Sequence, residues 1–187
     1  MVFREGGNMI YLTSDWHIGH DKDFIFKARG FNSIEEHDTA ILLHCNEIVG
    51  PEDELYILGD LAMGGDEKEW NRIYNQLICQ NVHYIQGNHD TDHKMDLYDG
   101  YGFDFHGYAD MIKYQKKAFY LSHYPTMVGN KEDKKFLWNL SGHTHSKNKF
   151  EYGQYRVYNV AVDAHNCYPV SIENIIKDIN KYTNVQM

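Results

Sequence analysis

The chain has 187 residues, a length that predicts one domain over 1–187, and its 42% hydrophobic and 24% charged residues are typical of a globular protein. This composition argues against a disordered or fibrous chain, and no run approaches the roughly 18 apolar residues that a membrane helix needs. The formal net charge of −9 argues against a main function in binding long nucleic acid through many Lys and Arg contacts.

Short apolar runs that end in Gly, Ser, Asp, Asn or His recur along the chain and predict buried strands. They cover 9–13, 55–58, 82–85, 118–121, 136–140 and 156–162. Two segments with helical periodicity lie between the first three runs. One begins at Ser33 and Glu36, which have the spacing of a capping box, and Gly50 with Pro51 ends it. The second helix is predicted to open at 66–69.

Apolar residues at helical spacing predict the buried faces of these helices. The first helix would bury Ile34, Ala40, Ile41, Leu43, Cys45 and Ile48, and the second Trp70, Ile73, Tyr74, Leu77 and Ile78. A third helix, capped by Ser171, would bury Ile172, Ile175, Ile176 and Ile179.

The order strand, helix, strand, helix, strand in the first half predicts parallel pairing with crossover helices. The second half differs, because 111–121 has the pattern of a hairpin that turns at Gln115 and Lys116, and further strands follow. We therefore expect an α/β (α+β) fold of mixed sheets with helices outside.

Polar side chains follow five of the predicted strands directly. They are Asp15 and His17, then Asp60, then Asn88, His89 and Asp90, then His123, then His143 and His145. Because strand ends in an α/β sheet lie along one edge, where ligands bind, we expect these side chains to converge. The i,i+2 pairs, Asp15 with His17 and His143 with His145, would each point to one side of an extended backbone. Glycines before Asp60, Asn88 and His143 allow close approach of the backbone.

Seven of these residues carry groups that bind metal ions: four imidazoles, two carboxylates and one amide oxygen. Seven ligands are too many for one tetrahedral ion, and they suit two divalent ions that share a bridging carboxylate. A mixture of imidazole and carboxylate favours Mn, Fe, Ni, Co or Zn over Ca or Mg. Each motif alone is also typical of an ordinary turn or helix cap, so the prediction depends on the whole set.

The set resembles the five motifs of the calcineurin-like metallophosphoesterases. They are Asp15-x-His17, Gly59-Asp60, Gly87-Asn88-His89-Asp90, His123 and Gly142-His143-x-His145, and they span Thr13 to Asp163. The sequences of 13–20 and 122–125 are similar to those of a compact bacterial and phage branch of predicted phosphoesterases. The resemblance implies a double β-sandwich of mixed sheets flanked by helices, with a dinuclear metal site at the C-terminal ends of strands.

The resemblance also implies a role for each residue. Asp15, His17 and His145 would hold the first ion, Asn88, His123 and His143 the second, and Asp60 would bridge the two. His89 would stabilise the transition state or protonate the leaving oxygen, with Asp90 orienting its imidazole, and Asn88 would also contact the substrate. Mn is the first choice for both ions, with Fe, Ni, Co or Zn as alternatives.

One departure from the family concerns the phosphate. In many members an Arg follows the Gly-Asp motif, but here Asp60 is followed by Leu61, Ala62 and Met63, which argues against protein-phosphatase activity. Arg29 is the predicted substitute, although it could equally be an ordinary surface residue, and His20 is a second candidate substrate contact. The remaining histidines are assigned to packing or surface: His37, His44, His83, His93, His106 and His165.

The sequence thus predicts a metal-dependent hydrolase of a phosphodiester or small phosphomonoester, a nucleotide among its candidate substrates, acting through in-line attack by a metal-bridging hydroxide. One alternative is a nuclease that acts on short or single-stranded nucleic acid. A second is a catalytically silent metal-binding scaffold with the same fold, which the intact ligand set disfavours. Three Cys without close spacing and no apolar leader predict a cytoplasmic protein, and no membrane partner is expected.

Overall fold

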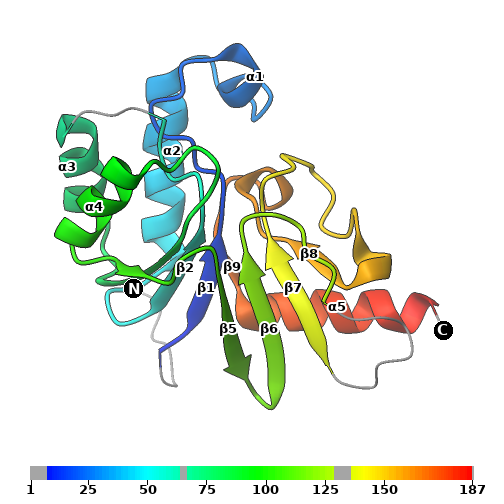
Figure 1. Cartoon of the computed structure of the whole chain (residues 1–187). Helices are drawn as coiled ribbons and strands as arrows, with labels where there is room; N and C mark the ends of the chain where they lie inside the picture. Colours follow the sequence, from blue (N-terminus) through cyan, green and yellow to red (C-terminus); the bar gives the residue numbers. More distant parts are fainter. Residues whose placement is uncertain (1–7, 64–66, 129–135, 187) are drawn as a thin grey trace.

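Two β-sheets form the centre of the computed structural model, which describes residues 8–63, 67–128 and 136–186 (Figure 1). The first sheet has the order β4-β3-β2-β1-β9 and contains β1 (Ile10–Thr13), β2 (Glu54–Leu58), β3 (Asn81–Ile85), β4 (Asp104–Phe105) and β9 (Val170–Ser171). The second has the order β5-β6-β7-β8 and contains β5 (Ala109–Tyr114), β6 (Lys117–Ser122), β7 (Leu137–Ser141) and β8 (Val157–Asn159).

Helices flank this pair of sheets. They are α1 (Asp23–Phe26), α2 (Ile34–Ile48), α3 (Glu67–Gln76), α4 (Asp92–Gly100) and α5 (Ile172–Gln186), with short 3₁₀ helices η1 (Gly153–Tyr155) and η2 (Val162–Ala164). Helices α2, α3 and α4 lie on one side of the first sheet and the second sheet lies on the other side (Figure 1). No helix among the described residues combines the length and the apolar composition needed to cross a membrane.

Strand directions confirm the predicted mixed topology. Strands β1, β2, β3 and β4 pair in parallel, and β9 adds an antiparallel edge beside β1. In the second sheet β5 and β6 form the predicted hairpin, whose turn residues Gln115 and Lys116 have φ of 46° and 65°. Two successive positive φ values match the right-handed twist of the flanking strands. Strands β6, β7 and β8 then run parallel.

The first sheet is apolar on both faces, which explains why its strands have continuous hydrophobic runs. In β2, Leu55 and Ile57 join the cluster beneath the helices, whereas Tyr56 and Leu58 join the cluster shared with the second sheet. The sheets therefore share one apolar interior, as the expected sandwich requires, and the four predicted isoleucines of α5 are buried in it.

Helix boundaries follow the predicted caps more closely than helix faces do. Ser33 accepts a hydrogen bond from the Glu36 N–H, and Ser171 accepts one from the Asn174 N–H, so both predicted N-caps are confirmed. The predicted face of α2 was wrong at Leu43, which is 61% exposed, because Leu42 is buried instead. Buried His37 and Asp38 rotate the inner face of α2 toward polar partners, and apolar spacing could not show this.

Two further predictions need correction. The run 156–162 is a strand only over β8. The Val160 N–H still donates to the Ser141 carbonyl oxygen of β7, and Ala161 then pairs with Ser14, which follows β1, before η2 begins. Helix α3 ends at Gln76, so the predicted face residues Leu77 and Ile78 follow it; Leu77 is buried as predicted, but Tyr74 and Ile78 are 38% and 46% exposed. The predicted opening at Asp66, and the side chains of Trp70 and Ile73, lie outside the described residues.

Candidate metal centre

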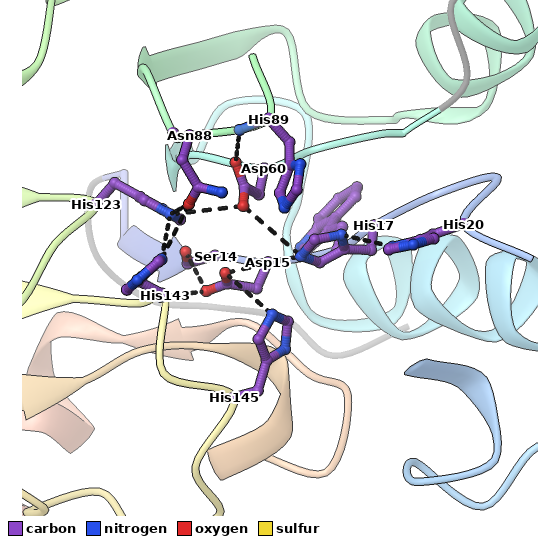
Figure 2. A network of polar contacts seen from close by, with 12 residues as sticks. Ser14, Asp15, His17, His20, Asp60, Asn88, His89, His123, His143 and His145 are labelled. Atoms are coloured by element: carbon purple, nitrogen blue, oxygen red, sulfur yellow. Dashed lines mark hydrogen bonds and ion pairs between the residues drawn. The ribbon is translucent and has the colours of Figure 1, made fainter. Parts of the chain in front are cut away.

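The seven predicted ligands converge on one space where the two sheets meet (Figure 2). Asp15 and His17 follow β1, Asp60 follows β2, and Asn88 follows β3. His123 follows β6, while His143 and His145 follow β7. Each of these loops leaves the C-terminal end of its strand. The seven side chains therefore meet at the C-terminal ends of strands, as expected, and strands of both sheets contribute.

The backbone at the centre is not extended. Positive φ occurs at five of the seven residues, with values of 60° at Asp15, 52° at His17, 56° at Asp60, 71° at His143 and 51° at His145. The prediction that each i,i+2 pair would point to one side of an extended strand was therefore wrong, although all four side chains face the centre. Left-handed backbone at non-glycine residues costs about 1–3 kcal/mol each and is concentrated at functional sites.

Two glycines allow the loops that carry the predicted ligands to approach one another closely. A Cβ atom at Gly87 would overlap the Asp60 carboxylate, and one at Gly142 would overlap the side chains of Ser14 and Asp15. Both glycines precede predicted ligands, so the expected role of these positions in close approach is confirmed.

The donor atoms form two groups joined by Asp60. In the first, Asp15 Oδ1 lies 3.8 Å from His145 Nε2 and 3.9 Å from His17 Nε2. In the second, Asn88 Oδ1 lies 2.8 Å from His123 Nε2 and 2.9 Å from His143 Nδ1. Asp60 Oδ2 is 3.7 Å from His17 Nε2 and 3.5 Å from His123 Nε2, so it faces both groups. Two sets among these residues have donor atoms close enough together to hold a metal ion: Asp15 with His17 and His145, and Asp15 with Asp60 and His123.

Two buried atoms at the centre are unsatisfied by the described residues. Asp15 Oδ1 and His17 Nε2 are buried and have no hydrogen-bond partner. The other oxygen of Asp15 is satisfied, because the His143 N–H donates to it at 2.8 Å and Ser14 Oγ lies 2.6 Å away. Burial lowers the pKa of His17 to about 2, so its imidazole is neutral and Nε2 can offer a lone pair. An orphaned carboxylate oxygen beside an orphaned imidazole nitrogen fits a divalent cation.

Hydrogen bonds outside the centre orient two imidazoles toward it. His123 Nδ1 lies 2.8 Å from the Leu58 carbonyl oxygen, and His145 Nδ1 lies 3.0 Å from Asp163 Oδ2. If each Nδ1–H donates to its acceptor, each Nε2 presents a lone pair inward, as metal-binding histidines usually do. Burial alone would lower the pKa of His145, but the hydrogen bond to Asp163 and the charge of Asp15 outweigh burial and raise it.

Asp90 does not have its predicted position. Its carboxylate is 4% exposed and accepts hydrogen bonds from the Asp60 N–H at 2.8 Å, the Gly87 N–H at 2.7 Å and the Tyr84 hydroxyl at 2.8 Å. The prediction that Asp90 orients the His89 imidazole was therefore wrong. Two backbone donors outcompete a side-chain partner here, and Asp90 instead fixes the loops that carry Asp60 and Asn88.

His89 lies at the rim of the centre, as Figure 2 shows. Its backbone N–H donates to Asp60 Oδ1 at 2.9 Å, and its ring centroid is 5.4 Å from that of His17. Next to it, His20 places Nδ1 3.1 Å from His17 Nδ1 and its ring centroid 6.4 Å from that of His89. Burial lowers the pKa of His20 as well. The predicted catalytic residue His89 and the predicted substrate contact His20 thus both lie beside His17.

Arg29 is not free to bind phosphate. Its side chain is 1% exposed and forms two hydrogen bonds to Asp163, of 3.0 and 2.8 Å. It also donates to the carbonyl oxygens of Trp16 and Asp15. The prediction of a phosphate contact, like its alternative of a surface residue, was wrong. Asp163 lies 134 residues away in the sequence, so no local pattern could reveal the pair.

Three contributing residues were missed by sequence reasoning. Asp163 holds both Arg29 and His145, and these hydrogen bonds outweigh burial and lower the pKa of its carboxyl group. Ser14 contacts Asp15, and it precedes the first motif directly. Buried Lys94 donates to the carbonyl oxygens of Ala62 and His89, both at 2.8 Å, and so connects two loops of the centre. Only Ser14 carried a signal, namely its adjacency to Asp15.

Comparison with known proteins shows likeness in fold. No model of a known protein family matches the sequence. An uncharacterized protein from Methanocaldococcus jannaschii is 29% identical over 177 residues, 92% of each chain. The crystal structure of a protein of unknown function from Aquifex aeolicus is 25% identical, with a TM-score of 0.69 over 91% of this chain and 99% of that one. Yfce, a phosphoesterase from E. coli, is 16% identical, with a TM-score of 0.43 over 81% and 77%.

The Aquifex aeolicus protein therefore shares the fold over most of the chain. The likeness to Yfce is too small to support an argument about activity. The functional case depends on the chemistry of the centre.

Proposed function

We propose that the protein is a dinuclear metal-dependent phosphoesterase of the calcineurin-like type. The observation that carries the proposal is the pair of orphaned, buried donor atoms, Asp15 Oδ1 and His17 Nε2, beside a carboxylate that faces two imidazole groups. Two divalent ions, when bound, would polarise a phosphoryl group and lower the pKa of a water molecule. Mn is the first ion to test, with Fe, Ni, Co and Zn as alternatives.

In this proposal each part of the chain has a separate task. Asp60 bridges the two groups of ligands, while the hydrogen bonds of Asp90 and Asp163 fix the loops and His145 in place. His89 projects at the rim, where it can hold a proton for the leaving oxygen or hydrogen-bond to the phosphoryl group. With Arg29 occupied by Asp163, the side chains of the predicted set that remain to contact phosphate are His20, Asn88 and His89.

A hollow beside the centre favours a phosphoester with a sizeable organic group. It has a volume of about 330 Å³ and is lined by Pro125, Met127, His143, Thr144, Tyr152, Tyr155 and Val157. His143 belongs both to the centre and to the hollow. Met127 is 69% exposed and Tyr155 is 46% exposed, so an aromatic or apolar ester group could pack there. We therefore favour a phosphodiester with an aromatic group, a nucleotide among them.

Hydrolysis of bis-p-nitrophenyl phosphate tests this function. The purified chain is stripped with a chelator, returned to Mn²⁺, and assayed before and after each step. We expect turnover only with the ion present, and its loss in Asp60→Asn. His93→Gln, a substitution at an exposed histidine of α4, is the matched control. A protein that binds two ions per chain and hydrolyses neither this diester nor p-nitrophenyl phosphate would instead support the catalytically silent scaffold.

A further inference from the structure

We infer that a second, mononuclear metal site lies at the edge of the first sheet, formed by His83, Asp104 and His106. His83 is on β3, Asp104 is its register partner on β4, and His106 follows β4 directly. Both histidines were assigned to packing or surface from the sequence. None of the three residues belongs to the centre described above, so this inference does not depend on the proposed function.

The three donor atoms form a compact triangle. His83 Nδ1 lies 3.0 Å from His106 Nε2 and 3.3 Å from Asp104 Oδ2, and His106 Nε2 lies 3.1 Å from the same oxygen. In a tetrahedral zinc site with bonds of about 2.0 Å, ligand atoms lie about 3.3 Å apart. The triangle thus has nearly the dimensions of one face of such a site.

Hydrogen bonds between neutral imidazoles leave one contact of this triangle between two acceptors. When His106 donates its Nδ1–H to Asp110 Oδ2, 2.8 Å away, its Nε2 presents a lone pair. A proton on His83 Nδ1 can serve one or both neighbours, yet the His106 lone pair still faces the Asp104 carboxylate at 3.1 Å. A cation between the three atoms would satisfy all of them at once.

The surroundings of the triangle resemble the outer shell of a metal site. Metal-binding histidines usually donate their second N–H to a carboxylate, which is the place that Asp110 takes behind His106. The His83 ring stacks on Tyr56, with centroids 4.3 Å apart and an interplanar angle of 15°. The backbone N–H of His106 donates to the Tyr84 carbonyl oxygen at 2.9 Å. Both imidazoles are therefore held in position before any ion arrives.

Two imidazoles and one carboxylate favour a borderline transition-metal ion, and we commit to Zn²⁺. Three protein ligands leave a fourth position for water, which the exposure allows: 66% for the Asp104 side chain and 20% and 22% for His83 and His106. An adjoining open hollow of about 490 Å³ is lined by Asn8, Glu54, Asn81, Val82, His83 and Asp104. The ion would hold two-residue β4 to β3 and, through Asp110, to β5 at the edge of the second sheet.

Counting bound zinc in the full-length protein tests the inference. The stripped chain is dialysed to equilibrium against Zn²⁺, and bound metal is measured by mass spectrometry. We expect His83→Gln/His106→Gln to bind one zinc ion fewer per chain than the wild type, and His93→Gln to bind the same number as the wild type. Asp110→Asn should retain the site with about 10–100-fold weaker affinity.

The position of the bound zinc ion is tested separately on the unmodified protein, because a substitution could also disturb folding. Crystals of the unmodified protein grown with Zn²⁺ should give an anomalous-scattering peak within about 2.0–2.2 Å of His83 Nδ1, His106 Nε2 and Asp104 Oδ2. Absence of a peak there, or equal zinc counts in the double variant and the wild type, would overturn the inference. If a peak appeared at these three residues but none appeared near Asp60, the result would contradict the proposed dinuclear centre and support the inferred site at His83, Asp104 and His106.

Discussion

Asp60 and His89 are joined by a hydrogen bond of 2.9 Å, yet they should fail in different ways when substituted. Asp60 offers an oxygen to both ligand groups, whereas the His89 ring lies at the rim. We expect His89→Ala to lower kcat at least 100-fold with bound metal nearly unchanged, in the range typical of general acid–base groups. Asp60→Ala should lose metal. Parallel measurement of turnover and metal content checks this, and loss of both in His89→Ala would contradict the assigned role.

Asp163 is the residue whose substitution should separate positioning from ligation. Asp163→Asn keeps the shape but weakens the hydrogen bond to His145 and leaves the Arg29 charge buried without its counterion. We expect metal affinity to fall about 10–100-fold and the free energy of unfolding to fall by about 3–5 kcal/mol. Isothermal calorimetry and urea unfolding give the two quantities.

A second carboxylate supplies the control for that experiment. Asp178 forms a hydrogen-bonded ion pair of 2.9 Å with Lys149, and both side chains are about one-third exposed. It also accepts a hydrogen bond of 2.8 Å from the Tyr158 hydroxyl, for which Asn retains an acceptor oxygen. Asp178→Asn should change stability by no more than about 1 kcal/mol and leave metal affinity unchanged. Equal effects of the two substitutions on metal affinity would mean that Asp163 has no special role at the centre.

Residue types at the centre were predictable because metal ligands are drawn from few side chains, and these stood directly after strands. The partners of those residues were not predictable. Arg29 and Asp90 were assigned from their distance in sequence to a motif, but Arg29 pairs with Asp163 across 134 residues and Asp90 binds the Asp60 N–H across 30. Contacts at such separations depend on the folded arrangement of both sheets, which local spacing does not encode.

At the scale of elements, the residue that ends η2 and reaches back to β8 is a titratable group that folding holds neutral. His165 Nε2 donates to the carbonyl oxygen of Asn159, the last residue of β8. Burial lowers the pKa of His165 to about 4, against the upward effect of that hydrogen bond. Between pH 6.5 and about 4 the unfolded chain therefore binds more protons at this residue than the folded chain does.

The contribution of neutral His165 to the free energy of unfolding is therefore complete above pH 6.5. It is lost as the pH falls toward about 4, and the total loss is about 3 kcal/mol. Urea unfolding at several pH values in the presence of a chelator measures this slope. His165→Gln, which cannot take up a proton, should have a shallower slope, and His93→Gln should keep the slope of the wild type. Identical slopes in all three proteins would contradict the prediction.

Elements with strong local signals were predicted well, and weak ones were missed. The hairpin had a two-residue turn and the helices α2 and α5 had Ser caps, so local chemistry fixed their boundaries. The two-residue strands β4 and β9 have no periodicity to detect, because they form only where a longer neighbour offers an edge. The strand predicted over 156–162 shows the reverse error: the apolar run indicated burial, but beyond β8 it forms only an isolated bridge between Ala161 and Ser14.

At the scale of the whole molecule, the candidate centre lies where loops of the two sheets meet. Asp15, His17, Asp60 and Asn88 come from loops after strands of the first sheet, and His123, His143 and His145 from loops after strands of the second. The two groups of ligands are brought together only when the chain is folded, so ions bound by both groups would stabilise the folded state. A ligand that binds only the folded state adds about 2.7 kcal/mol at 100 times its dissociation constant.

Chelation should consequently lower the thermal midpoint of the intact protein by about 5–10 °C, since 1 kcal/mol corresponds to about 2–4 °C at this size. Differential scanning calorimetry with Mn²⁺ and with chelator measures the shift. In Asp60→Asn the shift should be largely lost, because the bridging oxygen is replaced by an amide. In His83→Gln/His106→Gln it should persist, since those residues lie apart from the centre. A shift of equal size in Asp60→Asn and the wild type would mean that the ions bind elsewhere and that the two sheets are held together by their shared apolar interior alone.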